Sequence, residues 1–227
     1  MKISQRLSQI AKFVHPYRAI VDIGTDHALL PIYLLHQNII DTCIATDNKK
    51  GPLSKARDNL QKYHLLDNVQ LRLGDGLNPL TPNDQLDCII IAGMGGLLIV
   101  DILDKGKALL KYNKRLILQP NQHLEEVRLW LSNNYYEIIE ETIIKEDGIY
   151  YEIICAERSD IIVTYNEVEL KFGPKLLQAN NMLFYEKWDS LLKLKQEIIN
   201  KIPDNDENRF KLQQEIDLIQ EILKNKN

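Results

Sequence analysis

The chain has 227 residues, of which 44% are hydrophobic, and it carries a formal net charge of −4. This length predicts one domain of ordinary size with a small appendage, and the negative charge argues weakly against a nucleic-acid binder. The apolar stretches are too short for a transmembrane helix, and the first residues lack a signal-peptide pattern. We therefore expect a cytoplasmic protein with no membrane partner.

An amphipathic helix is predicted over residues 2–14, where Ile3, Leu7, Ile10 and Val14 recur at helical spacing. Short strands and helices then alternate. The strands are expected at residues 18–23, 42–47, 69–73, 86–92 and 115–119, and the helices at 29–37, 51–63, 97–110 and 123–133. Two further β-rich runs, 136–145 and 149–156, are joined by a Glu-Asp-Gly turn that predicts a hairpin.

This order of elements predicts an α/β fold with a Rossmann-like class I methyltransferase sheet, mostly parallel with one antiparallel strand. We assign residues 1–164 to that domain. Over residues 165–227 the β character disappears, and apolar residues follow two helical stretches on either side of a break at Ile202 and Pro203. The spacing predicts a C-terminal α-helical coiled-coil hairpin.

The three cysteines, Cys43, Cys88 and Cys155, all fall within apolar, strand-like runs. They show no C-x-x-C spacing, and the histidines do not cluster. We therefore expect buried free thiols and no metal site.

The segment Asp22-Ile23-Gly24-Thr25-Asp26-His27 begins in the last two residues of the first predicted strand and continues past its end. A glycine between a strand and a helix lets a ligand approach the backbone, and the Asp22 carboxylate favours a ligand with a positive charge. A dinucleotide site would prefer a glycine where Asp26 stands, because an acid there repels phosphate. S-adenosylmethionine, which has a sulfonium and an amino group but no phosphate, fits this pattern better.

Two more acids stand at the ends of the next strands. Asp47 ends the second strand, where its two oxygens can accept from both hydroxyls of a ribose. Asp75 precedes Gly76 after the third strand, so the carboxylate can accept from an adenine amino group while the glycine N–H donates to a ring nitrogen. Each acid alone is also explained as a cap or turn residue, but Asp22, Asp47 and Asp75 in register favour an adenosyl site.

A turn with three glycines, Gly93-Met94-Gly95-Gly96, follows the fourth strand. It predicts a tight backbone with exposed N–H groups at the place where class I methyltransferases hold the acceptor. Gln119-Pro120-Asn121, at the end of the fifth strand, offers amide groups to the same cleft. The predicted cofactor-binding residues are Asp22, Gly24, Thr25, His27, Asp47, Asn48, Asp75, Gly76, Gly93, Met94 and Gly95.

These motifs together resemble those of a known family. Asp-Ile-Gly-Thr-Asp-His-Ala-Leu-Leu-Pro (22–31), Gly-Asp-Gly-Leu (74–77), Ile-Ala-Gly-Met-Gly-Gly (91–96) and Leu-Gln-Pro-Asn (118–121) are similar to the bacterial tRNA (adenine-22-N1)-methyltransferase family. The resemblance implies S-adenosylmethionine as cofactor and methylation of adenine N1 in the D-loop region of tRNA. It also implies that Asp22, Gly24 and His27 line the methionine side of the cofactor.

Asp26 and His27 are the predicted catalytic residues. Adenine N1 is itself a nucleophile, so alignment of the reacting atoms can supply much of the rate without a covalent intermediate. Asp26 would stabilise the cationic product, or else Asp26 or His27 would take a proton from N6. A histidine in this position is equally explained as a cap or a packing residue. We expect residues 166–227 to bind the tRNA body, and we expect the protein to be a monomer.

Other functions use some of the same residues. A small-molecule methyltransferase shares the cofactor acids but gives no reason for a charged helical tail. A NAD-dependent dehydrogenase also uses an acid after its second strand, but Asp26 replaces the phosphate-binding glycine. A non-catalytic RNA-binding or scaffold protein has no need for three acids in register.

Overall fold

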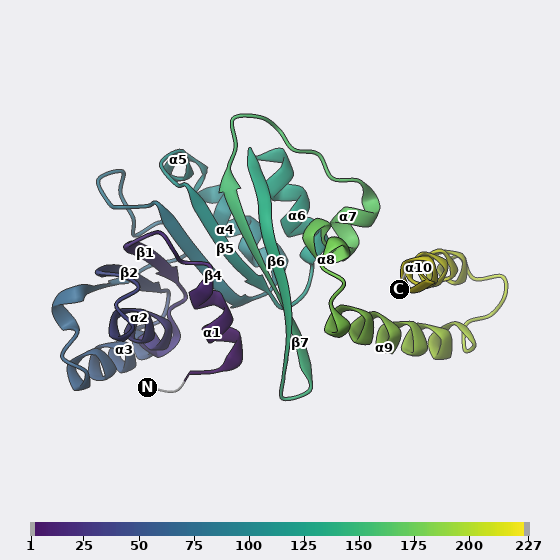
Figure 1. The fold of residues 1–227 in the computed structure, drawn as a ribbon, viewed down its shortest axis with the longest axis horizontal. Helices are drawn as coiled ribbons and strands as arrows, with labels where there is room; N and C mark the ends of the chain where they lie inside the picture. The colour runs from purple at the N-terminus through teal and green to yellow at the C-terminus, as the bar shows by residue number, and fades with distance from the viewer. Residues whose placement is uncertain (1–2, 225–227) are drawn as a thin grey trace. The chain divides into compact units, whose positions relative to one another are not determined.

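A computed structural model describes residues 3–224. Its strands form one seven-stranded sheet in the order β3-β2-β1-β4-β5-β7-β6 (Figure 1). The strands are β1 (Ala19–Ile23), β2 (Thr42–Asp47), β3 (Val69–Leu73), β4 (Cys88–Met94), β5 (Arg115–Pro120), β6 (Tyr136–Glu146) and β7 (Ile149–Arg158). Strands β1 to β5 run parallel, and β7 is antiparallel to both β5 and β6. The predicted sheet with one antiparallel strand is therefore confirmed.

Helices follow most of the strands. They are α1 (Gln5–Lys12), α2 (Leu29–His36), α3 (Lys50–Lys62), α4 (Gly96–Lys105), α5 (Lys107–Leu110), α6 (Leu124–Asn133), α7 (Glu167–Phe172), α8 (Pro174–Gln178), α9 (Met182–Ile199) and α10 (Glu207–Lys224), with short 3₁₀ turns η1 (Asp26–Ala28) and η2 (Leu66–Asn68). The first predicted helix begins later than expected, because Ser4 caps α1 by accepting a hydrogen bond from the Leu7 N–H. Residue 2 lies outside the described residues.

The helix predicted over 97–110 is divided at Gly106 into α4 and α5. An ideal Cβ at Gly106 would lie 2.1 Å from a methyl carbon of Leu77, so the chain passes closer to its neighbour than a side chain would allow. The sequence pattern of apolar residues continues through this point, and the division therefore comes from tertiary packing.

The sheet separates two hydrophobic clusters. Ile20 and Ile90 pack with residues of α1, α2 and α3, whereas their neighbours Val21 and Ile89 pack with residues of α4 and α6. This alternation follows from the two-residue period of a strand, and it buries both faces of the parallel strands. Cys43, Cys88 and Cys155 are free and buried in the structure, as expected.

One compact unit ends at Lys175 and a second begins at Leu176. The boundary expected after residue 164 lies earlier because a buried ion cluster holds the next segment to the first unit. Arg128 donates to Glu141 at 2.8 Å and to Glu152 at 2.6 Å, and it also donates to the Leu170 carbonyl at 2.9 Å. The second unit contains α9 and α10, which pack against each other as a helical hairpin. Its coiled-coil geometry stays a prediction.

Candidate functional site

The carboxyl ends of the parallel strands meet at one edge of the sheet. The strand order places β1 between β2 and β4, so the chain crosses in opposite directions from β1. Open α/β sheets bind ligands in the crevice at this switch point. Gly24 follows β1 and Met94 ends β4, so the predicted segments 22–27 and 93–96 meet at the crevice.

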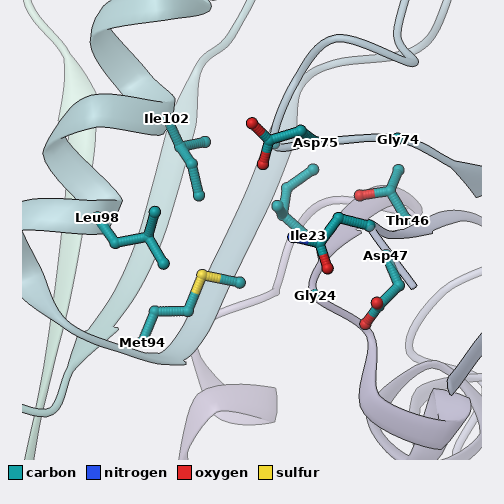
Figure 2. Close-up of a pocket in the computed structure, with 11 residues that line it drawn as sticks. Ile23, Gly24, Thr46, Asp47, Gly74, Asp75, Met94, Leu98 and Ile102 are labelled. Carbon is teal, nitrogen blue, oxygen red and sulfur yellow. The ribbon is translucent and has the colours of Figure 1, made fainter.

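A pocket opens at this switch point, and we call it the switch-point pocket (Figure 2). Carboxylates of Asp47 and Asp75 lie on separate sides of it, and Leu98 and Ile102 of α4 point into it from a third. Six of the predicted cofactor residues take part. The pocket is lined by Ile23, Gly24, Thr46, Asp47, Asn48, Gly74, Asp75, Gly76, Met94, Leu98 and Ile102.

Thr46 is a lining residue that the sequence analysis missed. Its side chain is fully buried at the end of β2, and its hydroxyl has no hydrogen-bond partner within residues 3–224. Buried polar groups are rarely left unpaired, so an unpaired hydroxyl beside Asp47 suits a site that receives a polar ligand. One Asp47 oxygen already accepts from the Lys49 N–H at 2.8 Å. The other oxygen has no such partner in that part of the chain.

A second pocket, which we call the α1 pocket, adjoins the first through the shared residue Gly24. Asp22, Thr25 and Asp26 line one part of it, and Arg6 of α1 lines another. Asp22 is only 6% exposed, and burial raises the pKa of its carboxyl to about 6. The Thr25 hydroxyl opposes the rise in this pKa, while the charges of Asp26 and Asp47 add to it. A cationic ligand group would lower the energetic cost of ionising Asp22.

Of the two predicted catalytic residues, Asp26 lines the α1 pocket and His27 is its neighbour in the chain. Asp26 is largely exposed, and its Oδ1 lies 3.5 Å from Nε2 of His27. His27 and Ala28 both adopt left-handed backbone conformations, with φ of 64° and 57°. Asn59 of α3 donates to the His27 carbonyl at 2.9 Å and so supports this turn. Strained non-glycine backbone of this kind gathers at functional sites.

Gly93 and Gly95 flank Met94 without lining either pocket. Gly93 has a φ of +77° and lies at a register shift between β4 and β5. The expected turn with exposed N–H groups is wrong at this position, because Gly93 still belongs to β4 and its N–H is hydrogen-bonded. Gln119, which is fully buried, accepts from the Gly93 N–H at 3.0 Å and from Nη1 of Arg6 at 2.8 Å. His27 also stays outside the lining of both pockets.

Comparison with known proteins identifies the family of this chain. A family model described as TrmK, tRNA (adenine(22)-N(1))-methyltransferase, matches residues 20–225. The tRNA (adenine(22)-N(1))-methyltransferase of Bacillus subtilis (strain 168) is 36% identical over 233 residues, which covers 98% of each chain. The chain belongs to the TrmK family. Family membership makes it a tRNA methyltransferase, and it sets aside the small-molecule, dehydrogenase and non-catalytic alternatives.

Solved structures similar to this TrmK chain contain the cofactor or its product. A Streptococcus pneumoniae protein in complex with S-adenosyl-L-methionine is 34% identical, with a TM-score of 0.90, and the match covers 98% of this chain and 100% of that one. The M. capricolum TrmK in complex with S-adenosyl-homocysteine is 30% identical, with a TM-score of 0.89 and 99% of each chain covered. S-adenosylmethionine is the cofactor of this methyltransferase, as the acids at the strand ends predicted.

No helix within residues 3–224 is long and apolar enough to cross a membrane. In the same range, no three His, Cys, Asp or Glu side chains gather as metal ligands.

Proposed function

We propose that the switch-point pocket and the α1 pocket together hold S-adenosylmethionine while N1 of adenine 22 of tRNA is methylated. The observation that carries this proposal is that Gly24 lines both pockets, with Asp47 and Asp75 in one and Asp22 in the other. A molecule with an adenosyl part and an amino-acid part needs two adjoining sites of different character. Similar proteins that bind this cofactor or its product support the same arrangement.

Each carboxylate binds a different part of the cofactor. Asp47 accepts from the ribose hydroxyls, and the unpaired Thr46 hydroxyl beside it offers a further polar contact. Asp75 accepts from the adenine amino group, with the Gly76 N–H as donor to the ring. Asp22 pairs with the amino group of the methionine part. The bound cofactor supplies an electrophilic methyl group on a sulfonium.

Met94 and the turn around it lie on the methyl side of the cofactor in this arrangement. The acceptor base must leave its stack to reach that side, since N1 of a paired or stacked adenine is inaccessible. Asp26 at the mouth of the α1 pocket then stabilises the positive charge that methylation places on the base. His27, 3.5 Å from Asp26, is the alternative acceptor for an N6 proton.

Binding measurements test the assignment of the cofactor pocket. We expect Asp47→Asn and Asp75→Asn each to weaken S-adenosylmethionine binding by tenfold or more in calorimetry, because each loses charge-assisted hydrogen bonds. Asp58→Asn, on the exposed side of α3, is the matched control and should bind normally. Normal affinity in both pocket variants would contradict the assignment.

The second unit is proposed to bind the tRNA body, in an enzyme that acts as a monomer in the cytoplasm. A helical hairpin adds nothing to the cofactor pocket, whose lining comes from the first unit alone. A chain that ends at Lys175 should keep its affinity for S-adenosylmethionine while its affinity for tRNA falls. Equal tRNA affinity of the shortened and full-length chains in gel-shift titrations would contradict this role.

A further inference from the structure

The loop that follows β5 is joined to the end of β4 by backbone hydrogen bonds. The Asn121 N–H donates to the Met94 carbonyl at 2.8 Å, and the Gly96 N–H donates to the Gln122 carbonyl at 2.9 Å. An ideal Cβ at Gly96 would lie 2.3 Å from the carbonyl oxygen of His123, so the two segments approach more closely than a side chain would allow. Since Met94 lines the switch-point pocket, these contacts fix the backbone of Asn121 beside that pocket.

A buried glutamine determines which way the Asn121 amide points. Gln119 is fully buried, and its Oε1 accepts from the Gly93 N–H at 3.0 Å and from Nη1 of Arg6 at 2.8 Å. Both of these groups only donate, so the oxygen of the Gln119 amide must face them. Its Nε2 therefore faces the other way and donates to Oδ1 of Asn121 at 3.0 Å. The Asn121 amide is thus held with its oxygen toward Gln119 and its nitrogen away from it.

The Asn121 amide keeps hydrogen-bonding capacity for a ligand. The residue is exposed, and its Nδ2 makes no hydrogen bond to any group within residues 3–224. Its Oδ1 has two lone pairs, of which the Gln119 amide uses one. An exposed asparagine usually turns its amide freely in water, whereas the orientation of this one is set by a buried partner. Asn121 can therefore donate and accept at the same time in a fixed orientation.

Adenine carries the complementary donor and acceptor on one edge. Its N6–H and N7 form the pair that an asparagine amide binds with two hydrogen bonds, and N1 lies outside this pair. Guanine would place its O6, an acceptor, against the Asn121 oxygen. We propose that Asn121 binds N6–H and N7 of the target adenine, with Gln119 as the positioning residue. N1 then gives its lone pair to the methyl carbon, and the electrons of the broken C–S bond return to sulfur.

This inference rests on the proposed function and adds a residue that binds the acceptor base. Asn121 lines neither the switch-point pocket nor the α1 pocket, so it is free of the groups assigned to the cofactor. Its contact with N7 also leaves the second N6 proton to Asp26 or His27. Loss of the Asn121 amide should therefore affect the acceptor and not the cofactor.

The test changes one atom of the base and one side chain together. The substrates are an unmodified tRNA with adenine at position 22 and the same tRNA with 7-deazaadenine there, in which a C–H replaces N7. The proteins are the full-length wild-type chain, Asn121→Ala and the control Asn83→Ala. Asn83 is also an exposed asparagine, but it lies with Ala19 and Thr42 at the amino ends of β1 and β2. The measured quantity is kcat/KM for each tRNA at saturating S-adenosylmethionine.

The ratio of kcat/KM between the two tRNAs isolates the contact with N7. Replacement of N7 also changes the nucleophilicity of N1, but it does so equally for every protein. We expect Asn121→Ala to lower kcat/KM for the adenine tRNA by tenfold or more, and its ratio to be at least tenfold smaller than that of the wild type. Asn83→Ala should match the wild type, and Asn121→Ala should bind S-adenosylmethionine normally in calorimetry.

Two outcomes would overturn the assignment. Equal ratios in the wild type and Asn121→Ala would show that the side chain acts on something other than N7. Wild-type kcat/KM in Asn121→Ala would show that the amide does not bind the base. If the wild-type chain transferred no methyl group to the adenine tRNA, the proposed function itself would fail. If it methylated that tRNA and the two ratios were equal, this inference alone would fail.

Two conservative variants test the orientation of the amide. Asn121→Asp keeps an oxygen toward Gln119 but replaces the donor to N7 by an acceptor, so its ratio should fall at least as far as that of Asn121→Ala. Gln119→Glu cannot donate to Asn121, whose Nδ2 then turns toward the new carboxylate, and the ratio should fall again. A wild-type ratio in Asn121→Asp would overturn the donor role. The same result in Gln119→Glu with a wild-type Tm would overturn the positioning role.

Discussion

The terminal methyl carbon of Met94 lies where a side chain on Gly24 would begin. An ideal Cβ at Gly24 would be 2.3 Å from Met94 Cε, and Figure 2 shows the thioether reaching across the pocket toward β1. Two segments that are far apart in the chain therefore meet at the switch point of the sheet. Gly24 is required both by this close approach and by its φ of +73°.

Gly24→Ala should weaken S-adenosylmethionine binding by at least tenfold and lower the free energy of unfolding by about 1 kcal/mol, the cost of a left-handed alanine. The methyl group also forces the Met94 side chain to move within the pocket. The double variant Gly24→Ala/Met94→Ala should recover part of the affinity and none of the stability. Calorimetry and urea unfolding measure the two effects, and wild-type affinity in the single variant would contradict the account.

Asp22→Asn should stabilise the ligand-free protein while it weakens cofactor binding. The pKa of Asp22 is about 6 in the folded chain and 3.8 ordinarily, so its buried charge lowers stability as pH rises through this range. The difference corresponds to about 3 kcal/mol at pH 8 and to less than about 1 kcal/mol at pH 4. Urea unfolding of both proteins at the two pH values measures this gain. A variant less stable than the wild type at pH 8 would contradict it.

The ion pair between Arg72 and Asp84 predicts a contribution to stability that is lost in acid. Arg72 donates to Asp84 twice at 2.7 Å, and this pairing lowers the pKa of Asp84 to about 2. Since the folded pKa lies below the ordinary 3.8, the stabilisation is present above about pH 4 and declines as pH falls toward 2. Asp84→Asn should cost about 2 kcal/mol at pH 7 and less than half of that at pH 2.5. A cost independent of pH would rule out the ion pair as its source.

Arg128→Met should be the most destabilising single change in the first unit. It removes the guanidinium that pairs with the buried carboxylates of Glu141 and Glu152, and breaking a buried ion pair typically costs about 3–5 kcal/mol. Replacing all three groups together, with Arg128→Met, Glu141→Leu and Glu152→Leu, should restore much of the stability because no buried charge remains. Thermal and urea unfolding test both proteins, and a loss below about 1 kcal/mol in the single variant would contradict the prediction.

The sheet and much of the cofactor pocket could be predicted because their signals are local. Asp47 and Asp75 stand directly at the ends of short apolar runs, and parallel strands bring such ends to one edge. The predicted strands at 42–47 and 69–73 match β2 and β3 residue for residue.

The remaining parts of the site depend on contacts that no local pattern encodes. Arg6 and Gln119 are 113 positions apart in the chain. The sequence pattern shows Arg6 only as a polar residue of an amphipathic helix and gives no sign of their contact. Thr46 looks like any threonine in a strand until the structure shows its hydroxyl buried and unpaired. The attachment of residues 165–175 to the first unit depends on such contacts as well, since Arg128 binds carbonyls of α7 from a distant helix.

Methyl transfer to adenine 22 of tRNA is the reaction that the proposed site must catalyse. The full-length enzyme would be incubated with labelled S-adenosylmethionine and an unmodified tRNA transcript, and with the same transcript carrying guanine at position 22, followed by nucleoside analysis. We expect 1-methyladenosine from the first transcript and no labelled product from the second. Equal labelling of both transcripts, or a different methylated nucleoside, would contradict it.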